Sequence, residues 1–146
     1  GVGLLAAAMG DRFGTETVMT TVESDPVATG FALRNLADWP KAEAQTGRVD
    51  AWLRATARQA SSKDREGFAR ATVILDPPRS GAGREVVQYL ADFAPAQIVY
   101  VACDPVAFAR DVGYFAARGY RLADLRAFDL FPHTHHVEAV GTLLRV

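Results

Sequence analysis

The sequence predicts an α/β fold in which a mostly parallel sheet is closed by one antiparallel C-terminal strand. Apolar, β-branched runs alternate with helical stretches along the chain, which is typical of a parallel sheet covered by helices on both faces. The last two predicted strands, residues 120–130 and 137–146, are joined by a short Pro/His loop without room for a crossover helix, so they must pair antiparallel. At 146 residues, 49% of them apolar, the chain is long enough for one domain spanning residues 1–146.

The first third of the chain predicts two helices around one strand. Residues 2–9 are apolar and rich in alanine, which suits a helix that packs on a sheet. Residues 17–22 are mostly β-branched and predict a strand that ends at Glu23. The pair Asp25-Pro26 joins an N-cap residue to a proline suited to the first helical position, so a helix is predicted over residues 26–38.

The middle of the chain predicts one helix between two polar loops. Residues 41–47 and 61–67 lack apolar periodicity and are predicted as loops. Residues 49–60 carry apolar side chains at helical spacing and predict an amphipathic helix.

Two buried strands then deliver polar side chains to strand-to-helix turns. Residues 71–75 run into Asp76-Pro77-Pro78-Arg79, where two prolines keep the backbone stiff and extended. Residues 98–102 end at Cys103, the only cysteine. Helices are predicted to follow these turns at residues 82–93 and 105–117. The carboxyl ends of parallel strands are where such sheets expose their chemistry, so both turns are candidate sites.

A third candidate site lies at the start of the chain. Gly1 and Gly3 stand at the mouth of the first helix and fit a close backbone approach to a ligand, and Glu23 follows about 20 positions later at a strand end. In nucleotide-binding units, an acidic residue so placed accepts from both ribose hydroxyls. In the alternative interpretation, the glycines serve an ordinary turn and Glu23 only favours the next helix N-terminus.

Composition excludes several functional classes. The net charge of −1 leaves no global basic field, so any polyanion contact must come from a local patch. A single cysteine excludes an internal disulfide or a cysteine-built metal site and fits a reducing cytoplasm. No apolar run approaches the roughly 20 residues of a membrane span, and no signal peptide is visible. The chain begins without Met inside a strand–glycine turn–helix unit, so we expect a truncated domain whose first strand is missing.

With these segments in place, the chain resembles the catalytic domain of the RNA 5-methyluridine methyltransferases, which have a Rossmann-like fold and use S-adenosylmethionine. The matching segments cover nearly the whole chain, and those after Glu23 are far more specific than any glycine pattern. They are Gly1-Val2-Gly3-Leu4, Glu23, Asp76-Pro77-Pro78-Arg79, Cys103-Asp104-Pro105, Phe108-Ala109-Arg110-Asp111, and residues 129–138, which read Asp-Leu-Phe-Pro-His-Thr-His-His-Val-Glu.

The resemblance implies a role for each catalytic residue. Cys103 matches the nucleophile that adds to carbon 6 of uracil, and Glu138 matches the base that removes the proton from carbon 5. Asp76 matches the carboxylate between cofactor and target base. The resemblance further implies that Pro77, Arg79 and His136 contact or shape the substrate pocket.

The resemblance also implies the ligands and partners. S-adenosylmethionine would be held by Gly1, Gly3, Glu23 and Asp76, and the substrate would be tRNA or rRNA. The family's N-terminal RNA-binding portion is absent, so this chain alone is expected to bind the cofactor poorly and to be inactive. The three histidines have no accompanying ligand pattern, so no metal is expected. No membrane contact is expected either.

Other interpretations compete with this one. In isolation, Cys103 would be an inert core thiol. An amino-group methyltransferase also carries an acidic residue or Asn before Pro-Pro, but Arg79 replaces the aromatic that would follow, and that chemistry needs no cysteine. A 5-methylcytosine enzyme has its cysteine in a different motif. A non-catalytic cofactor-fold or RNA-binding module remains the alternative from another class. The chain departs from the family at Ala102, Asp104 and Arg48, where relatives often carry Ser or Thr, Asn, and an acidic residue.

Overall fold

Two units make up the computed structural model, which describes residues 1–134 and 137–146. The N-terminal unit comprises residues 1–55 and the C-terminal unit residues 56–146. One domain over the whole chain stays a prediction, because the placement of the two units relative to each other is not determined.

The N-terminal unit is built on two parallel strands. Its elements are α1 (Leu4–Phe13), β1 (Met19–Glu23), α2 (Pro26–Asn35) and β2 (Ala42–Thr46), and α3 (Val49–Gln59) crosses into the second unit. The strands pair from Met19 with Ala42 to Glu23 with Thr46. The predicted strand and the helices around it are confirmed, and Asp25 caps α2 by accepting from the Val27 amide at 2.8 Å.

Strand β2 corrects the prediction of a loop over residues 41–47. Its residues have weak β propensity, and pairing with β1 overrides that weakness. Ala42 and Ala44 are half-buried, whereas Glu43 and Gln45 are exposed. Half-buried alanines therefore alternate with exposed polar residues along β2, as in a strand with one face covered.

The C-terminal unit follows the predicted order of elements with one addition. It contains α4 (Ser62–Arg70), β3 (Thr72–Leu75), α5 (Gly83–Phe93), β4 (Gln97–Ala102), α6 (Pro105–Ala116), β5 (Tyr120–Phe128) and β6 (Glu138–Arg145). Helix α4 replaces the loop predicted over residues 61–67. The Ser61 hydroxyl accepts from the Asp64 amide at 3.2 Å, and the Asp64 carboxylate accepts from the Ser61 amide at 2.9 Å. This capping box, with Asp in place of the usual Glu or Gln, starts a helix in an otherwise polar stretch.

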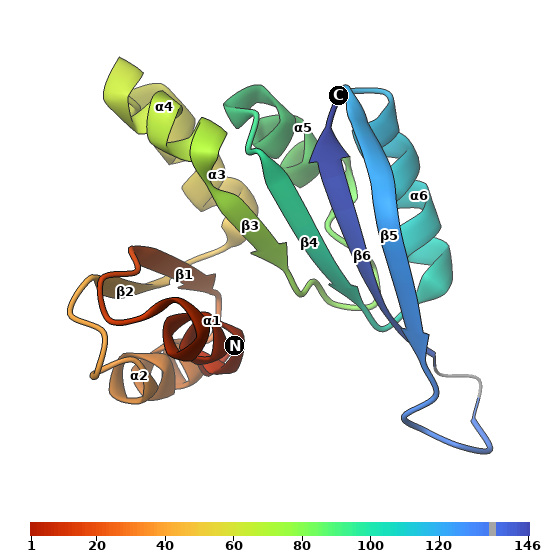
Figure 1. The fold of residues 1–146 in the computed structure, drawn as a ribbon, viewed down its shortest axis with the longest axis horizontal. Helices are drawn as coiled ribbons and strands as arrows, with labels where there is room; N and C mark the ends of the chain where they lie inside the picture. Colours follow the sequence, from red (N-terminus) through yellow and green to blue (C-terminus); the bar gives the residue numbers. More distant parts are fainter. Residues whose placement is uncertain (135–136) are drawn as a thin grey trace. The chain divides into compact units, whose positions relative to one another are not determined.

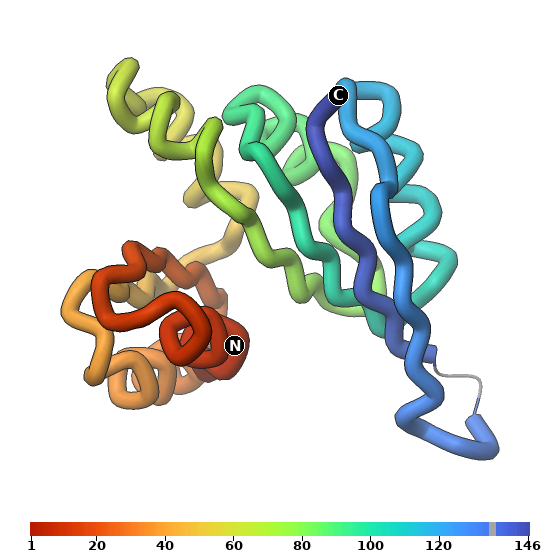
Figure 2. Tube along the Cα trace, in the orientation of Figure 1, coloured from red at the N-terminus to blue at the C-terminus, as the bar shows by residue number. Residues whose placement is uncertain are grey.

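The sheet of the C-terminal unit has the strand order β3-β4-β6-β5 (Figure 1). β3 and β4 pair in parallel, and β6 pairs antiparallel with both of its neighbours. Consequently β3, β4 and β5 run in one direction and only the C-terminal strand opposes them. The trace in Figure 2 shows β6 running back beside β5. The predicted fold class is confirmed.

The core of this unit lies between the sheet and helices α5 and α6, which lie on one face of it (Figure 1). Every second residue of β4 and β6 is buried against these helices. Phe115 contacts Tyr120 edge-on, with ring centroids 5.7 Å apart, and the Tyr120 hydroxyl donates to the Pro95 carbonyl at 2.8 Å. Apolar burial and aromatic contacts thus fix the helices to the sheet.

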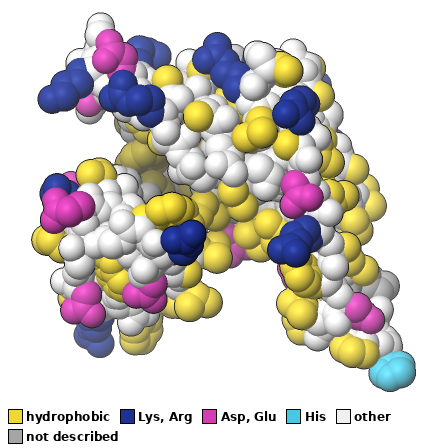
Figure 3. Space-filling model, viewed as in Figure 1, with side chains coloured by type: hydrophobic (Ala, Val, Ile, Leu, Met, Phe, Trp, Pro, Cys, Tyr) yellow, Lys and Arg dark blue, Asp and Glu magenta, His cyan; other side chains and the backbone are white. Residues whose placement is uncertain are grey.

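The edge strand β5 exposes apolar side chains. Leu122, Leu125 and Phe128 are each at least 38% exposed, and Figure 3 shows hydrophobic side chains on this part of the surface. Charged side chains on the same strand, such as Arg121 and Arg126, counteract pairing with another sheet edge.

Replacing Gly141 by Ala is expected to destabilise the fold. Gly141 lies at the centre of β6, and a Cβ atom there would lie 2.5 Å from Cζ of Phe108. Phe108 is itself fixed edge-on against Tyr100, at 5.3 Å between centroids. We expect the free energy of unfolding to fall by about 1–3 kcal/mol, measured by urea denaturation.

Gly113→Ala in α6 is the matched control, because no atom lies within 4 Å of the added methyl group. Alanine in a helix is preferred over glycine, so this variant should be as stable as the parent or more so. Equal stability of Gly141→Ala and Gly113→Ala would contradict the packing of Phe108 over β6.

Candidate functional site

The three residues predicted to be catalytic stand at one end of the four-stranded sheet. Asp76 directly follows β3, Cys103 directly follows β4, and Glu138 is the first residue of β6. Because β6 runs antiparallel, its amino end meets the carboxyl ends of β3 and β4 (Figure 1). Strand topology therefore brings together residues that are far apart in the sequence.

Strand register specifies how Cys103 and Glu138 face each other. Ala102 of β4 pairs with Ala139 of β6, so the next position along the two strands opposes Cys103 to Glu138. Ala102 and Ala139 are both buried against the helices. Successive side chains of a strand alternate between faces, so strand geometry predicts that Cys103 and Glu138 begin on the face opposite to Ala102 and Ala139.

Asp76 follows the same rule on the other neighbour of β4. Leu75, the last residue of β3, pairs with Tyr100, and both are buried on the helix-covered face. Asp76 therefore begins on the same side as Cys103 and is exposed.

Cys103 is half-buried rather than sealed in the core. It borders a shallow hollow between the turn after β3 and the start of α6. The hollow is lined by Pro77, Pro78, Arg79, Gly81, Tyr100, Ala102, Cys103, Asp104 and Ala107. A partly exposed thiol at a strand end fits a reactive group better than a core thiol does.

Asp104, one of the departures from the family pattern, is the N-cap of α6. Its carboxylate accepts from the Ala107 amide at 2.7 Å, and Pro105 occupies the first helical turn. A side-chain acceptor at this position satisfies one of the free amides of the helix. The residue beside Cys103 thus has a structural role.

A buried carboxylate that the sequence analysis placed in a matching segment, without a role, lies behind the turn after β3. Asp111 of α6 is 0% exposed. Its Oδ2 atom accepts from the Tyr100 hydroxyl at 2.7 Å and from the amides of Ala82 at 2.7 Å and Gly83 at 3.2 Å. Its Oδ1 atom accepts from Nε and Nη2 of Arg110, at 3.0 and 2.8 Å.

A sequence signal for Asp111 was available. The buried residues of α6 are Ala107, Phe108, Asp111 and Phe115, so Asp111 occupies a position of the apolar stripe. A charged residue there must be paired to be tolerated. Burial, and then the hydrogen bond to Asp111, raise the pKa of Tyr100, which keeps this phenol a hydrogen-bond donor. Asp111 also raises the pKa of the Arg110 guanidinium.

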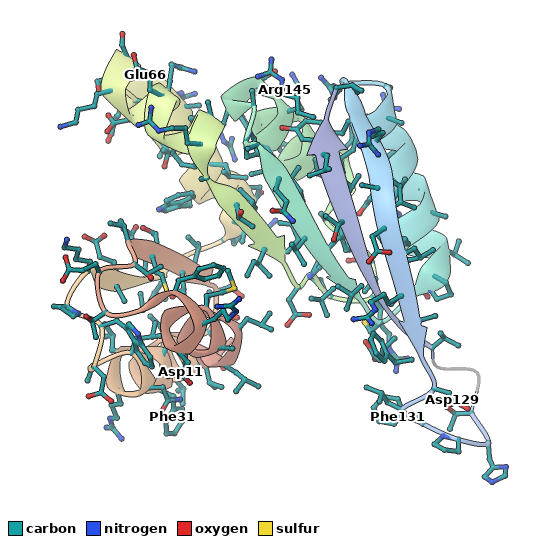
Figure 4. The ribbon with its side chains drawn as sticks, viewed as in Figure 1. Asp11, Phe31, Glu66, Asp129, Phe131 and Arg145 are labelled. Carbon is teal, nitrogen blue, oxygen red and sulfur yellow. The ribbon has the colours of Figure 1, made fainter. Side chains whose placement is uncertain are left out.

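The segment between β5 and β6 carries the remaining part of the motif. Asp129 and Phe131 lie beyond the end of β5 (Figure 4), and the Thr134 hydroxyl donates to the Phe131 carbonyl at 2.7 Å. His136, predicted to contact the substrate, lies outside the described residues, as does His135. The roles of Pro77 and Arg79 in substrate contact stay predictions.

Glu23 stands at the end of β1 in the N-terminal unit. Its carboxylate accepts from the Asp25 amide at 2.8 Å and from the Ser24 hydroxyl at 3.1 Å. The Asp25 amide, and then the Ser24 hydroxyl, lower the pKa of Glu23. Glu23 is therefore ionised and available as an acceptor at the end of β1.

Helix α2 packs against the glycine turn. Gly3 has a φ of +90°, and a Cβ there would lie 3.2 Å from the Ala32 Cα atom. Asn35, whose role the sequence did not reveal, donates to the Val2 carbonyl at 2.9 Å.

Arg48, another departure, pairs with Asp50 beyond β2. Its Nε atom lies 3.1 Å from an Asp50 carboxylate oxygen, and this contact lowers the pKa of Asp50. Among residues 1–134 and 137–146, no group of three His, Cys, Asp or Glu side chains could hold a metal ion. No helix within the same residues has the length and apolar character required to cross a membrane.

Comparison with known proteins places these features in context. The family model described as tRNA (uracil-5-)-methyltransferase matches residues 52–146. A protein of Streptomyces avermitilis named "uncharacterized RNA methyltransferase" is 44% identical over 144 residues, which are 98% of this chain and 31% of that protein. The chain thus spans about a third of the length of the curated relatives it matches.

Solved structures show the same fold. The tRNA (uracil-54, C5)-methyltransferase of Pyrococcus abyssi, in complex with S-adenosyl-L-homocysteine, is 32% identical, with a TM-score of 0.75 over 99% of this chain and 32% of that one. NSun6 from Pyrococcus horikoshii, with SFG, has a TM-score of 0.72 over 97% of this chain and 44% of that chain. At 11% identity, the second match concerns the fold alone.

The placement of Cys103 predicts that it reacts in the folded protein. We expect iodoacetamide to label the native protein at one site, at a rate within about tenfold of the urea-unfolded chain, because a half-buried thiol is open to reagent. Mass spectrometry of the intact protein over time measures this rate. A Cys103→Ser variant should take no label, and native protection of more than a thousandfold would mean an inert core thiol.

Proposed function

The chain belongs to the tRNA (uracil-5-)-methyltransferase family, and on this premise we propose that it transfers a methyl group from S-adenosylmethionine to carbon 5 of a uridine in tRNA or rRNA. The observation that supports this chemistry most directly is the register that opposes Cys103 to Glu138 across β4 and β6. A nucleophile and a base on facing positions are what a two-step addition and elimination at one pyrimidine ring requires.

Cys103 would perform the first step. Carbon 5 of uracil is too weak a nucleophile to accept a methyl group unaided. Addition of the Cys103 thiolate to carbon 6 forms a carbon–sulfur bond and moves the electron pair of the 5,6 double bond toward carbon 5 and the 4-carbonyl. Carbon 5 then has enolate character.

When bound, S-adenosylmethionine would supply a methyl group from its sulfonium sulfur to carbon 5. Loss of the methyl group would leave that sulfur as a neutral thioether. Glu138 would then take the proton from carbon 5. The electron pair of that carbon–hydrogen bond restores the 5,6 double bond and expels the Cys103 thiolate. The enzyme returns to its starting state once Glu138 releases its proton.

Asp76 and its prolines would orient the ring. The Asp76 carboxylate is exposed at the sheet end, and Pro77 and Pro78 restrict the backbone that carries it. A carboxylate in this position accepts hydrogen bonds from donors of the cofactor or the uracil. Arg79 and His136 complete the proposed substrate contacts.

The N-terminal unit would hold the cofactor. Glu23 is ionised and stands at the end of β1, as an acceptor for two ribose hydroxyls must. Gly3, packed against Ala32, and Asn35, which donates to the Val2 carbonyl, hold the glycine turn in its conformation. The residues present therefore fit S-adenosylmethionine, with Gly1, Gly3 and Glu23 as its binding residues.

The natural substrate and setting belong to the proposal as well. The substrate is RNA, and a further RNA-binding portion of the same protein would supply much of the target choice. We propose that the protein acts in the cytoplasm.

The proposed mechanism predicts a covalent intermediate. The full-length protein, mixed with S-adenosylmethionine and RNA containing 5-fluorouridine, should form an adduct that survives denaturing electrophoresis. Carbon 5 then carries fluorine instead of hydrogen, so Glu138 has no proton to remove and Cys103 is not expelled. Cys103→Ala should form none. Glu138→Gln should accumulate an adduct with ordinary uridine RNA, because elimination is blocked. A tRNA transcript and an rRNA fragment, tested in parallel, distinguish the two substrate classes.

Asp92→Asn on α5 is the control for this experiment, since Asp92 is exposed and lies outside the proposed site. It should form the adduct at the parent rate. Undiminished methylation by Cys103→Ala, read by nucleoside mass spectrometry, would refute the cysteine mechanism. Methylation of an amino group instead would favour the amino-group alternative, and no methylation of any RNA would favour a non-catalytic module.

Glu23→Ala should weaken the binding of S-adenosylmethionine without changing the reactivity of the Cys103 thiol. Hydrogen bonds to a charged acceptor contribute about 1.5–3 kcal/mol each, so we expect the Kd for S-adenosylmethionine to rise at least about tenfold in isothermal titration calorimetry. Glu43→Ala is the matched control, because Glu43 is an exposed carboxylate on β2, three positions before the strand end. If the two variants bind alike, Glu23 is not a cofactor ligand.

A further inference from the structure

We propose that Asp111 is a positioning residue that fixes the Asp76 turn relative to Cys103, an inference that rests on the proposed function and extends it to a residue outside the proposed catalytic set. Asp111 accepts hydrogen bonds from three elements that surround the site. It is 0% exposed, so its side chain would touch no substrate atom. Its effect must therefore act through the backbone that it holds.

The cost of burying Asp111 is offset by unusually complete pairing. An isolated carboxylate is strongly disfavoured in a protein interior, and it is tolerated only when its oxygens are satisfied. Both oxygens of Asp111 are engaged, and all of their hydrogen bonds are 3.2 Å or shorter. An apolar residue would fill this position in the helix stripe at less cost, which points to a specific use for the charge.

The segment that Asp111 holds is the end of the turn that begins at Asp76. The Ala82 and Gly83 amides donate to Asp111, and Arg110 also donates to the Ser80 carbonyl at 2.7 Å. The Gly81 amide closes the turn by donating to the Pro78 carbonyl at 2.7 Å. The turn is thus attached to β3 at one end and to Asp111 at the other.

Gly81 shows how closely the turn is held. Its φ is +79°, and a Cβ atom there would lie 2.5 Å from Oδ2 of Asp111 and 2.6 Å from Nη2 of Arg110. Only glycine allows this approach at that backbone conformation. The two prolines restrict the backbone between this contact and Asp76, so a displacement at Asp111 is transmitted along a stiff segment.

The other partners of Asp111 connect the turn to Cys103. Tyr100 belongs to β4, three residues before Cys103, and its hydroxyl binds both Asp111 and the Ala82 amide. Asp111 itself is on α6, whose N-cap, Asp104, adjoins Cys103. The carboxylate therefore joins the turn to both elements that flank the thiol, and it sets the separation of Asp76 from Cys103.

The test compares Asp111→Asn with the parent in the full-length protein, using the 5-fluorouridine adduct. Asparagine keeps the shape but loses the charge, and it offers an amide donor toward Arg110 or toward the Ala82 side. Misplacement by about 1 Å costs on the order of a hundredfold in rate. We expect the single-turnover rate of adduct formation, at saturating RNA and S-adenosylmethionine, to fall about 100-fold, while the Kd of each ligand changes less than threefold.

Arg110→Lys is the second variant, in case Asp111→Asn does not fold. Arg110 is 42% exposed, and lysine keeps the charge but cannot bind Asp111 and Ser80 together. Its rate should fall about tenfold with unchanged ligand affinity. Arg118→Lys, a conservative change just beyond the C-terminal end of α6, should leave the rate unchanged.

The outcomes separate this inference from the proposed function. If the parent forms no adduct, the proposed function fails. The positioning role is wrong if the parent forms the adduct and both variants, Arg110→Lys and folded Asp111→Asn, form it at the same rate as the parent. A lower melting temperature with an unchanged rate per folded molecule would likewise show that Asp111 only supports the fold.

Discussion

The structure of the candidate site depends on the backbone pairing of β4, which is hydrogen-bonded in parallel to β3 and antiparallel to β6. Parallel pairing places two strand-to-helix turns at one end of the sheet, and antiparallel pairing adds the amino end of a third strand. The placement of Asp76, Cys103 and Glu138 follows from that arrangement, because Asp76 and Cys103 directly follow β3 and β4, and Glu138 is the first residue of β6. A shift by one residue in either register would turn one of these side chains to the helix-covered face.

Sequence patterns predicted most elements because their signals are local. Asp25-Pro26 and Asp104-Pro105 start helices by capping chemistry, and the run at residues 98–102 is apolar enough to be a strand. Strand β2 was missed because pairing with β1, a long-range interaction, stabilises residues of weak β propensity. Helix α4 was missed because its signal is a capping box in a polar stretch without apolar periodicity.

The residues of the candidate site also differ in how far the sequence reveals their role. Cys103 and Glu138 were found from their places next to predicted strands and from a motif. Asp111 stands in a matching segment and in the apolar stripe of α6, but its role was not assigned, because its donors come from Tyr100 and Ala82, which are 11 and 29 positions away along the chain. Asn35 and its contact to the Val2 carbonyl are 33 positions apart, so that role was not assigned either. Periodicity can indicate that a buried carboxylate must be paired, but only tertiary contacts show with which groups.

Helix α6 links the stability of the fold to the geometry of the site. Its apolar side packs on the sheet through Phe108 and Phe115, which fixes its position relative to β4 and β6. Phe108 packs against Tyr100, the residue that binds Asp111, and fills the space left by Gly141. Loosening this packing would therefore shift Tyr100 and Asp111 together. The side-chain contacts of Phe108 that close the core therefore also hold Tyr100, one of the hydrogen-bond partners of Asp111.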